Sequence, residues 1–507
     1  MINLAARGNK LYNNRTIYLI NPPLNNFMSK YSNDHTFPPL GLLSIATDIK
    51  NKTQWNTRVY DAEITSFNEI ANDMQRDKPA VVGLSVLAET YNSSLEFAKL
   101  AKKMGAITLF GNDQAALLGK NILKKQPIVD AICTAEHGEN MAVPFLEALE
   151  NGTDLDTVPE MMYRNDRGEI MKSSAKAPPL EGKYKMDRYP IVDRSLLPQS
   201  IWDVYLENYK KTYGFMHPND KITGCTTINK GRGCPRLNNR CKYCGILDLT
   251  IKLSSPCIFW QEIEDARNKI NANIFYEAFD SMSSVPWWIK FLIQSRPEHL
   301  ADTKFITYAQ AREVNEKLVG LFKELGAVMI NMGLDSGDDT ILKRLKSPND
   351  SLAANINAVK LINEAGMHVF CSFVLGGPGE SIESLQNTID FTKWLADNKL
   401  AAAIEAQPLM PRKKAKIGDW FDQPKIAALD MAAMGLTMKN EHLLHEISDK
   451  WNNEDIVDTP LMSDIYARVF TTVTYQRLVE AANEIVSYAK TKGIGSGSVG
   501  IKVEPQQ

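Results

Sequence analysis

Two successive series of alternating strand-like and helix-like segments constrain the fold of this chain more than any other feature. Alternation of this kind is typical of βα crossovers and a mostly parallel sheet. We therefore predict that residues 1–150 form a flavodoxin-like, Rossmann-type α/β domain with helices on both faces of the sheet. Its expected strands are residues 16–20, 57–60, 80–87, 106–110 and 128–134.

The second series predicts a partial (β/α)6, TIM-like barrel over residues 223–410, an open relative of the eight-stranded barrel. Residues 151–222 read as a polar, proline-punctuated linker with small strands and one helix near residues 202–213. Residues 411–492 are helical and strand-poor, and the Gly/Ser-rich residues 493–507 are expected to form a disordered tail. The expected barrel strands are residues 225–229, 273–279, 304–308, 328–333, 368–375 and 401–407.

Polar, glycine-rich or proline-rich segments follow four strands of the first domain. Ligands of parallel sheets bind beyond the carboxyl ends of the strands, so these segments are candidate binding loops. Ordinary turns would have a similar composition, and this alternative stays open. The segments are Asn21-Pro22-Pro23, Ala88-Glu89-Thr90, Gly111-Asn112-Asp113 and Glu136-His137-Gly138-Glu139.

Three of the seven cysteines lie in one loop, directly after the first strand of the second series. Cys234, Cys241 and Cys244 have the spacing C-x6-C-x2-C. Three thiolates can hold a [4Fe–4S] cluster with one open iron, which can chelate a small molecule and pass it an electron. A structural zinc ion or a four-thiolate cluster would need a fourth ligand. A distant fourth zinc ligand, or three unrelated thiols, are the alternatives. The odd cysteine count argues against a disulfide scaffold.

This loop resembles the cluster loop of radical S-adenosylmethionine (SAM) enzymes. The resemblance lies in Gly231-Arg232-Gly233-Cys234-Pro235 and Cys241-Lys242-Tyr243-Cys244, with Tyr243 at the position of the family's aromatic residue. The first gap has six residues here, whereas the family pattern is C-x3-C-x2-C. The resemblance implies that the three cysteines hold a [4Fe–4S] cluster whose open iron binds SAM.

Further strand-end motifs are similar to SAM-binding elements of the same family. Phe373 to Glu380 resembles its G-x-P-G-E strand end, and Met332 to Gly337 resembles its G-[IL]-E-S-G strand end with aspartate in place of glutamate. A glycine-rich turn lets the backbone come close to a ligand. The residues that the resemblance places near SAM are Asp280, Arg312, Asp335, Ser336, Gly376, Gly377, Pro378, Gly379 and Glu380.

The N-terminal half resembles the cobalamin-binding domain that precedes many radical SAM enzymes. The D-x-H-x-x-G motif of standalone cobalamin domains is absent, since Asp34-His35 lacks the glycine pattern, and no lower cobalt ligand is predicted. A vestigial domain that no longer binds cobalamin is the alternative. The cofactor-binding residues implied by the resemblance are Asn21, Pro22, Pro23, Ser85, Gly111, Asn112, Gly138 and Glu139.

Together these resemblances imply a cobalamin-dependent radical SAM enzyme. It would methylate an unactivated carbon through a 5′-deoxyadenosyl radical. Cyclisation, rearrangement or oxidation without methyl transfer are alternative fates of the same radical. A methylthiotransferase would need a second three-cysteine cluster, which Cys133 does not supply. A non-catalytic cobalamin-binding sensor would not need three cluster thiols.

Charge and hydropathy limit the expected partners and location. The net charge is −2, with 58 basic and 60 acidic residues, so a nucleic-acid partner is not expected, although a local basic patch is compatible with this balance. Residues 412–416 carry a short basic run, either a solvated surface or a contact for an anionic substrate. No apolar run is long enough for a transmembrane helix, and a cytoplasmic location is expected. The small-molecule or peptide substrate is unknown, and an external low-potential reductant of flavodoxin or ferredoxin type is implied.

Overall fold

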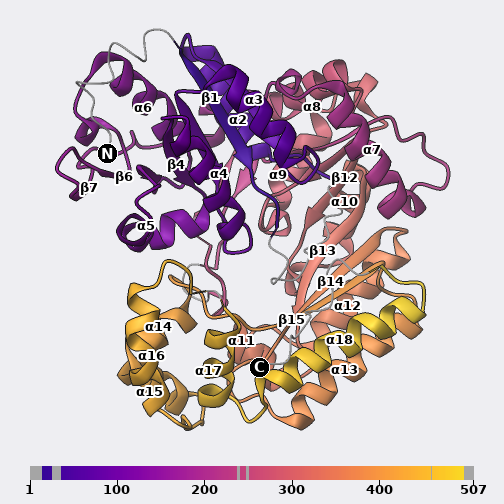
Figure 1. Cartoon of the computed structure of the whole chain (residues 1–507). Helices are drawn as coiled ribbons and strands as arrows, with labels where there is room; N and C mark the ends of the chain where they lie inside the picture. Colours follow the sequence, from indigo (N-terminus) through magenta and orange to yellow (C-terminus); the bar gives the residue numbers. More distant parts are fainter. Residues whose placement is uncertain (1–13, 25–35, 237–239, 247–249, 458, 496–507) are drawn as a thin grey trace.

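Two large, mostly parallel sheets and a group of C-terminal helices form most of the structure, a computed structural model (Figure 1). The structure describes residues 14–24, 36–236, 240–246, 250–457 and 459–495. In Figure 1 the first domain lies at the upper left, the second sheet runs down the right side, and the C-terminal helices lie below the first domain.

The first sheet has seven strands in the order β2-β1-β3-β4-β5-β6-β7. Its first five strands are parallel, and β1 pairs with both β2 and β3, with Ile17 opposite Thr57 and Val81. The order of these five strands is that of flavodoxin-like sheets, which confirms the predicted fold class. The bounds are β1 Thr16–Asn21, β2 Asn56–Asp61, β3 Val81–Ser85, β4 Ile107–Gly111, β5 Ala131–Cys133, β6 Met161–Arg164 and β7 Ile170–Lys172.

Helices cover both faces of this sheet. On one face α2 packs against α6, and their buried side chains share a core with Ile17 and Leu19 of β1. On the other face α3, α4 and α5 bury Ile70, Phe97 and Leu118 beside the alternate β1 residues. This division follows from the pleat, because successive strand residues point to opposite faces. The bounds are α2 Leu40–Lys52, α3 Phe67–Asp77, α4 Tyr91–Lys103, α5 Asp113–Lys125 and α6 Glu139–Asn151.

The predicted linker is more closely integrated than its composition indicates. β6 and β7 extend the first sheet as antiparallel strands, so the sheet continues past residue 150. Further along, α7 (Gln199–Tyr213) packs next to the first barrel strand. Its buried Tyr205 hydroxyl donates a hydrogen bond of 2.7 Å to Asp61 at the end of β2. This segment therefore ties the two sheets together.

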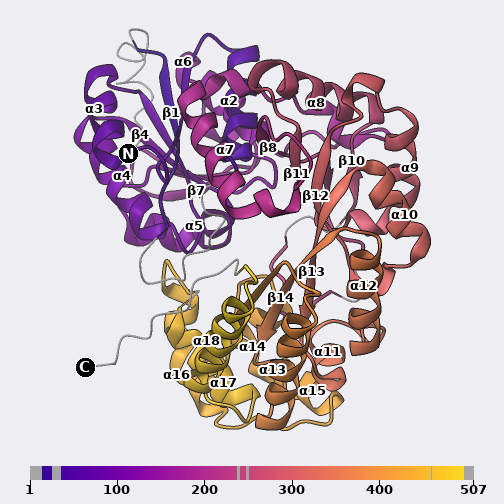
Figure 2. The same ribbon diagram turned by 90° about the vertical axis from the view of Figure 1, so that its right-hand side faces the viewer.

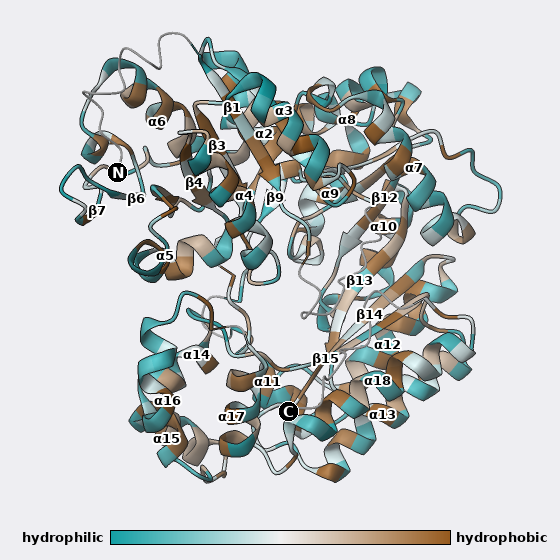
Figure 3. Cartoon of the chain, in the orientation of Figure 1, coloured by the Kyte–Doolittle hydropathy of each residue, from teal (hydrophilic) through white to brown (hydrophobic). Residues whose placement is uncertain are grey.

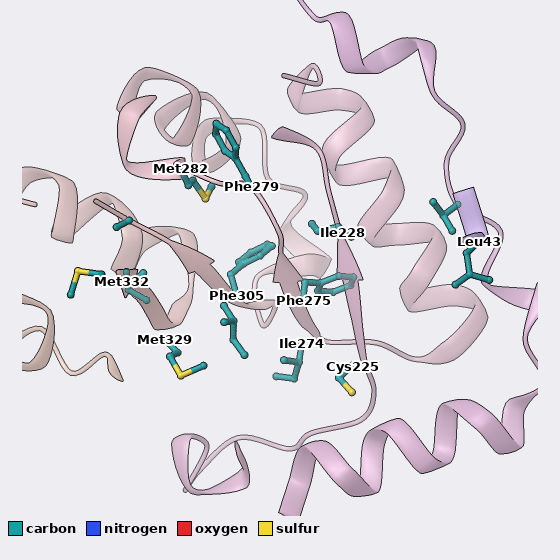
Figure 4. Packing of buried hydrophobic residues seen from close by; sticks show 14 of the residues in the cluster. Leu43, Cys225, Ile228, Ile274, Phe275, Phe279, Met282, Phe305, Met329 and Met332 are labelled. Atoms are coloured by element: carbon teal, nitrogen blue, oxygen red, sulfur yellow. The ribbon is translucent and has the colours of Figure 1, made fainter. Parts of the chain in front are cut away.

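The second sheet contains six strands, all parallel, in the order β15-β14-β13-β12-β11-β8. Its chain order is sequential, as expected for successive βα units, and β8 and β15 lie at its two ends, as in an open barrel. Figure 4 shows Phe275, Phe305 and Met329 packed in its core. The bounds are β8 Cys225–Ile228, β11 Ile274–Glu277, β12 Lys304–Tyr308, β13 Ala327–Asp335, β14 His368–Leu375 and β15 Ala403–Pro408.

Helices alternate with these strands and are followed by the C-terminal group. Trp420 and Trp451 are fully buried and form part of the core of that group. The helices between the strands are α8 Pro256–Ile270, α9 Pro286–Gln294, α10 Glu316–Leu325, α11 Asp339–Leu345, α12 Leu352–Glu364 and α13 Ile382–Asp397. The C-terminal helices are α14 Lys416–Asp422, α15 Pro424–Ala433, α16 His442–Asn453, α17 Pro460–Phe470 and α18 Tyr475–Thr491.

The last described residues correct part of the predicted disordered tail. α18 lies beside α13 (Figure 2) and also packs against β15, and the chain beyond α18 pairs with β15. The Gly495 N–H donates to the Ala402 carbonyl, and the Ile404 N–H donates to the Gly495 carbonyl, both at 3.0 Å. These backbone bonds and the buried Ile494 fix residues 493–495. The rest of the predicted tail, residues 496–507, lies outside the described residues.

The C-terminal helices also contact the first domain. Asp455, between α16 and α17, accepts a 2.7 Å bond from the Tyr91 hydroxyl, and its carbonyl accepts one from Gln114. The three parts of the chain therefore meet around a common centre. Figure 3 shows hydrophobic residues concentrated on the strands and hydrophilic residues on the outer helices. Among the described residues, no helix is long and apolar enough to span a membrane.

Candidate functional site

The cysteine loop starts in a fixed backbone geometry. It lies between two short strands that pair antiparallel, β9 (Gly231–Arg232) before it and β10 (Lys252–Leu253) after it. The buried Glu277 carboxylate, at the end of β11, accepts hydrogen bonds from the Lys230 and Gly231 N–H groups at 3.0 and 3.3 Å. Asp280 accepts one from the Gly233 N–H at 3.0 Å. Burial raises the pKa of Glu277 to about 8. The second barrel strand thus orients the backbone just before Cys234.

A buried ion pair anchors the long first gap of the loop. Both terminal nitrogens of Arg236 donate to Asp350 at 2.8 Å, and its Nε donates to Gln310 Oε1 at 2.5 Å. Ser347 donates to the same carboxylate at 2.7 Å. The Gln310 amide nitrogen lies 4.0 Å from Cys234 Sγ. The six-residue gap therefore contains a side chain, that of Arg236, that fixes the loop to the barrel.

We expect Arg236→Met to destabilise the protein by about 3 kcal/mol, because it leaves the Asp350 carboxylate buried without its charged partner. The measurement is the thermal midpoint of the reconstituted protein, followed together with its iron content. A double variant, Arg236→Met/Asp350→Leu, removes both charges and serves as the control. It should unfold at a higher temperature than Arg236→Met. Equal midpoints for the single variant and the unaltered protein would contradict this role.

The second half of the loop brings the other two thiols close together. The Cys244 N–H donates to the Cys241 carbonyl at 3.0 Å, forming a turn around Tyr243. Burial raises the pKa of Cys234 and, to about 11, that of Cys241, and the nearby charge of Cys244 adds to both shifts. All three thiols are partly buried and none forms a disulfide.

The loop offers three thiols, one fewer than the four ligands of a structural zinc site. Within the described part of the chain, no group of three or more His, Cys, Asp or Glu side chains is arranged to hold one metal ion. A structural zinc site would bring four such ligands around one position. A four-iron cluster spreads its thiolates further apart than one ion does. Three neighbouring thiols on one loop are therefore consistent with a [4Fe–4S] cluster that keeps one iron open.

The glycine-rich turn after β14 is packed within the protein. Glu380 accepts hydrogen bonds from the Gly376 and Gly377 N–H groups, each at 3.2 Å, and burial raises its pKa to about 7. A Cβ atom at Gly376 would lie 2.7 Å from Leu478 of α18, and one at Gly377 would lie 2.6 Å from Ile341 of α11. Close approach of these helices therefore explains the first two glycines, independently of any ligand.

Other residues that the motif resemblance placed near SAM also have protein partners. Asp335, with φ of 64°, forms an ion pair of 2.7 Å with Lys346. The Ser336 hydroxyl contacts the Thr388 hydroxyl at 3.0 Å. Arg312 donates to Ser347 at 3.4 Å. Asp280 differs from this group, because it lines the central cavity described below.

A cavity of about 380 Å³ opens at the carboxyl ends of the first-domain strands; we call it the first-domain cavity. Leu19, Leu109 and Phe145 contribute apolar surface to it. Asn112, with φ of 75°, caps α5 and donates to Ser85 at 3.0 Å, and Glu139 accepts from Ser44 at 2.5 Å. Pro22 and Pro23 do not line it. Six of the eight residues predicted for cobalamin do: Asn21, Ser85, Gly111, Asn112, Gly138 and Glu139.

A second cavity, of about 400 Å³, lies between the two domains; we call it the central cavity. Tyr243, Cys244 and Asp280 line it from the cysteine loop and β11. Leu87 and Asp113 border both this cavity and the first-domain cavity, so the two adjoin. The remaining lining residues are Ala88, Glu89, Gln114, Leu117, Gly245, Ile246, Val374, Gln407, Pro408, Leu409, Met410 and Arg412.

Sequence reasoning missed the role of Arg232, although this residue stands in the quoted cysteine-loop motif. Arg232 lines the first-domain cavity and donates to His137 Nδ1 at 2.8 Å. The His137 ring stacks on Tyr189 with 4.7 Å between ring centres. Burial and the Arg232 charge lower the His137 pKa to about 3. The residue next to Gly233-Cys234 thus reaches across into the first domain.

A charged pair at the central cavity was also missed. The Arg412 guanidinium lies 3.4 Å from the buried Glu89 carboxylate, so a residue after β15 meets one after β3. The basic run at residues 412–416 indicated either a solvated surface or an anion contact, and the structure gives Arg412 an acidic protein partner. Separation by more than 300 residues explains why no local pattern signals this pair.

Two family models match separate parts of the chain. The model of the radical SAM superfamily matches residues 228–392, and the model of the B12-binding domain matches residues 32–143. The first match contains the cysteine loop and the barrel strands from the end of β8 to β14. The second contains most of the strands and helices that form the first-domain cavity.

Curated relatives and solved structures extend this similarity along the chain. An uncharacterised methyltransferase from Pyrococcus horikoshii is 24% identical over 75% of this chain and 78% of its own length. The cytidylyl-2-hydroxyethylphosphonate methyltransferase of Streptomyces wedmorensis is 22% identical over 65% of this chain and 64% of its own length. The anaerobic magnesium-protoporphyrin IX monomethyl ester cyclase of Rubrivivax gelatinosus is 21% identical over 65% of this chain and 58% of its own.

Two solved structures show a similar fold. The radical SAM methyltransferase TsrM from Kitasatospora setae, with cobalamin and a [4Fe–4S] cluster bound, aligns with a TM-score of 0.62 at 15% identity, over 81% of this chain and 75% of its own. The cobalamin-dependent radical enzyme OxsB, with aqua-cobalamin and SAM bound, aligns with a TM-score of 0.64 at 16% identity, over 93% of this chain and 66% of its own.

Proposed function

Because the chain belongs to the radical SAM enzymes that carry a B12-binding domain, we propose that it is a cobalamin-dependent methyltransferase acting on an unactivated carbon. The single observation that carries this proposal is that the two proposed cofactor sites meet at one cavity. The cysteine loop and the first-domain cavity both border the central cavity. A carbon bound there would lie between the two cofactors.

Different residues of the chain would hold the cluster and the cobalamin. In this proposal Cys234, Cys241 and Cys244 hold the cluster, and the first-domain cavity holds cobalamin. When bound, the cluster supplies an electron that cleaves SAM to methionine and a 5′-deoxyadenosyl radical, and cobalamin carries a methyl group. Arg232 joins the cysteine loop to the wall of the first-domain cavity and would help to position the two sites relative to each other.

The central cavity would receive the substrate. Its walls come from both sheets and from the start of the C-terminal region, which keeps a reactive radical away from bulk water. Glu89, Asp113, Asp280 and Arg412 supply its charged groups, so we propose a substrate with polar or ionic groups beside the reacting carbon. The helical region at residues 411–492 would shape this pocket, because Asp455 holds it against the first domain.

One observation favours a second candidate function. The Rubrivivax relative is a cyclase, and its similarity covers as much of this chain as that of the Streptomyces methyltransferase. A radical reaction that forms a ring, without methyl transfer, would use the same cysteine loop. The two functions differ in the fate of the SAM methyl group.

The metals bound by the protein and the products formed from SAM test the proposal. We expect anaerobic purification with hydroxocobalamin to give about four irons and one cobalt per chain. With SAM and dithionite, the protein should form 5′-deoxyadenosine, and methyl transfer to the bound cobalamin should release S-adenosylhomocysteine. Iron and 5′-deoxyadenosine without cobalt or S-adenosylhomocysteine would reject methyl transfer and support the second candidate. Absence of both products would reject the radical mechanism.

This chemistry also bears on the partner and the location. Radical SAM enzymes need a reductant, and we propose a protein of flavodoxin or ferredoxin type as the source of the electron. An open iron is sensitive to oxygen, and free thiols persist in reducing compartments. We therefore propose that the protein works in the cytoplasm.

A further inference from the structure

A groove of about 810 Å³ lies beside the cysteine loop and carries a concentration of positive charge. One acidic residue, Asp419, also lines it. The whole chain has a net charge of −2, so this concentration is local. We call it the basic groove, defined by Arg240, Lys242, Lys343, Arg344, Lys414 and Lys416.

Two of these side chains project into solvent. Lys343 on α11 and Lys414 before α14 are exposed. Lys416 forms an ion pair of 3.0 Å with Asp430, and Lys346, which also lines the groove, pairs with Asp335. The paired residues add little net charge, so the exposed lysines dominate the attraction for a partner. Such a surface attracts acidic surfaces over a distance of about 10 Å at ordinary ionic strength.

The walls of the basic groove are attached directly to the cysteine loop. The Lys242 N–H donates to the Leu345 carbonyl of α11 at 2.8 Å, and the Ile417 N–H of α14 donates to the Lys242 carbonyl at 2.9 Å. Lys242 is the neighbour of Cys241 in the chain. A molecule bound between α11 and α14 would therefore lie close to Cys241, one of the three proposed cluster ligands.

The loop separates the basic groove from the central cavity. Arg240 and Lys242 line the groove, whereas Tyr243, Cys244 and Gly245 line the cavity. One side of the loop thus faces the cavity proposed for the substrate, and the other faces a positively charged groove. An electron reaching the cluster from the groove would not have to cross the space of the substrate.

We propose that the basic groove is the docking surface of the electron donor, an acidic protein of flavodoxin or ferredoxin type. This inference rests on the proposed function, which requires one electron for each SAM cleaved. The carrier would be oxidised by one electron and the cluster reduced by one. Electron-transfer encounters use small interfaces, and complementary charge sets their rate more than their final affinity. An exposed basic rim next to the cluster has these properties.

A charge-reversal variant tests the docking surface. Lys343→Glu/Lys414→Glu alters the groove and replaces no cysteine and no residue that lines the central cavity. The matched control is Lys290→Glu/Lys317→Glu, on exposed positions of α9 and α10. Formation of 5′-deoxyadenosine is measured with two reductants: dithionite, and a purified flavodoxin reduced by its NADPH-dependent reductase. Binding of the same flavodoxin to each reconstituted protein is measured separately at low and high salt.

We expect the groove variant to lose about tenfold or more of its flavodoxin-driven rate and to keep its dithionite-driven rate. Flavodoxin binding should weaken in parallel, and the control variant should match the unaltered protein in both assays. A fall with both reductants would assign the groove to substrate or cluster binding instead, and no fall with either would also overturn the proposal. If the unaltered protein cleaves no SAM with dithionite, the proposed function fails, and the binding assay still decides the docking surface.

Discussion

A variant in which Cys234, Cys241 and Cys244 are all replaced by alanine should lose its iron and its SAM cleavage. All three thiols come from the same loop, and none of them forms a disulfide. We expect bound iron and 5′-deoxyadenosine formation to fall below about 1% of the values for the unaltered protein, because the variant lacks all three proposed cluster ligands. The broad absorbance near 400 nm should disappear with them.

Cys257 supplies a matched control for this experiment. It is the exposed cysteine at the start of α8, away from the loop. Cys257→Ala should keep the full iron content and the full rate. The triple variant should still bind cobalamin, since the first-domain cavity does not depend on the three thiols. If the triple variant retains the iron and cleaves SAM, the assignment of the cluster ligands is wrong.

The order of the strands could be predicted from the sequence because the pattern is local. Apolar runs separated by helical segments mark β1 to β5, β8 and β11 to β15 within a few residues of their bounds. Parallel pairing of successive βα units then follows from general rules of chain connection. Small strands were expected within residues 151–222, but the pairing of β6 with β5 was not, because it joins the segment to a sheet whose other strands lie earlier in the chain.

The contacts that build the site could not be predicted in the same way. Arg236 and Asp350 are 114 residues apart, and Arg232 and His137 are 95 residues apart. Their pairing depends on how two sheets and a loop come together, which no local periodicity records. The motif residues around Gly376 were located correctly at a strand end. Their tight packing under α11 and α18 became visible only in the folded chain.

The second large effect, on cobalamin binding, is expected when one substitution places a large side chain in the first-domain cavity. Gly111 ends β4, lines the cavity and lacks a positive φ, and a Cβ atom there would lie 3.6 Å from Cys133, an ordinary contact. Gly111→Ala should therefore bind cobalamin normally. Gly111→Phe would place an aromatic ring in a cavity of about 380 Å³.

For Gly111→Phe we expect bound cobalt to fall below about one tenth of the unaltered value, because a buried ligand cannot share its pocket with a large side chain. Cobalt per chain is measured after reconstitution with hydroxocobalamin, with iron content as the internal control. Iron and dithionite-driven 5′-deoxyadenosine formation should persist, because the cysteine loop belongs to the other domain. S-adenosylhomocysteine should disappear with the cobalt. Full cobalt binding by Gly111→Phe would show that cobalamin occupies another site, and loss of iron as well would point to general misfolding rather than to a filled cavity.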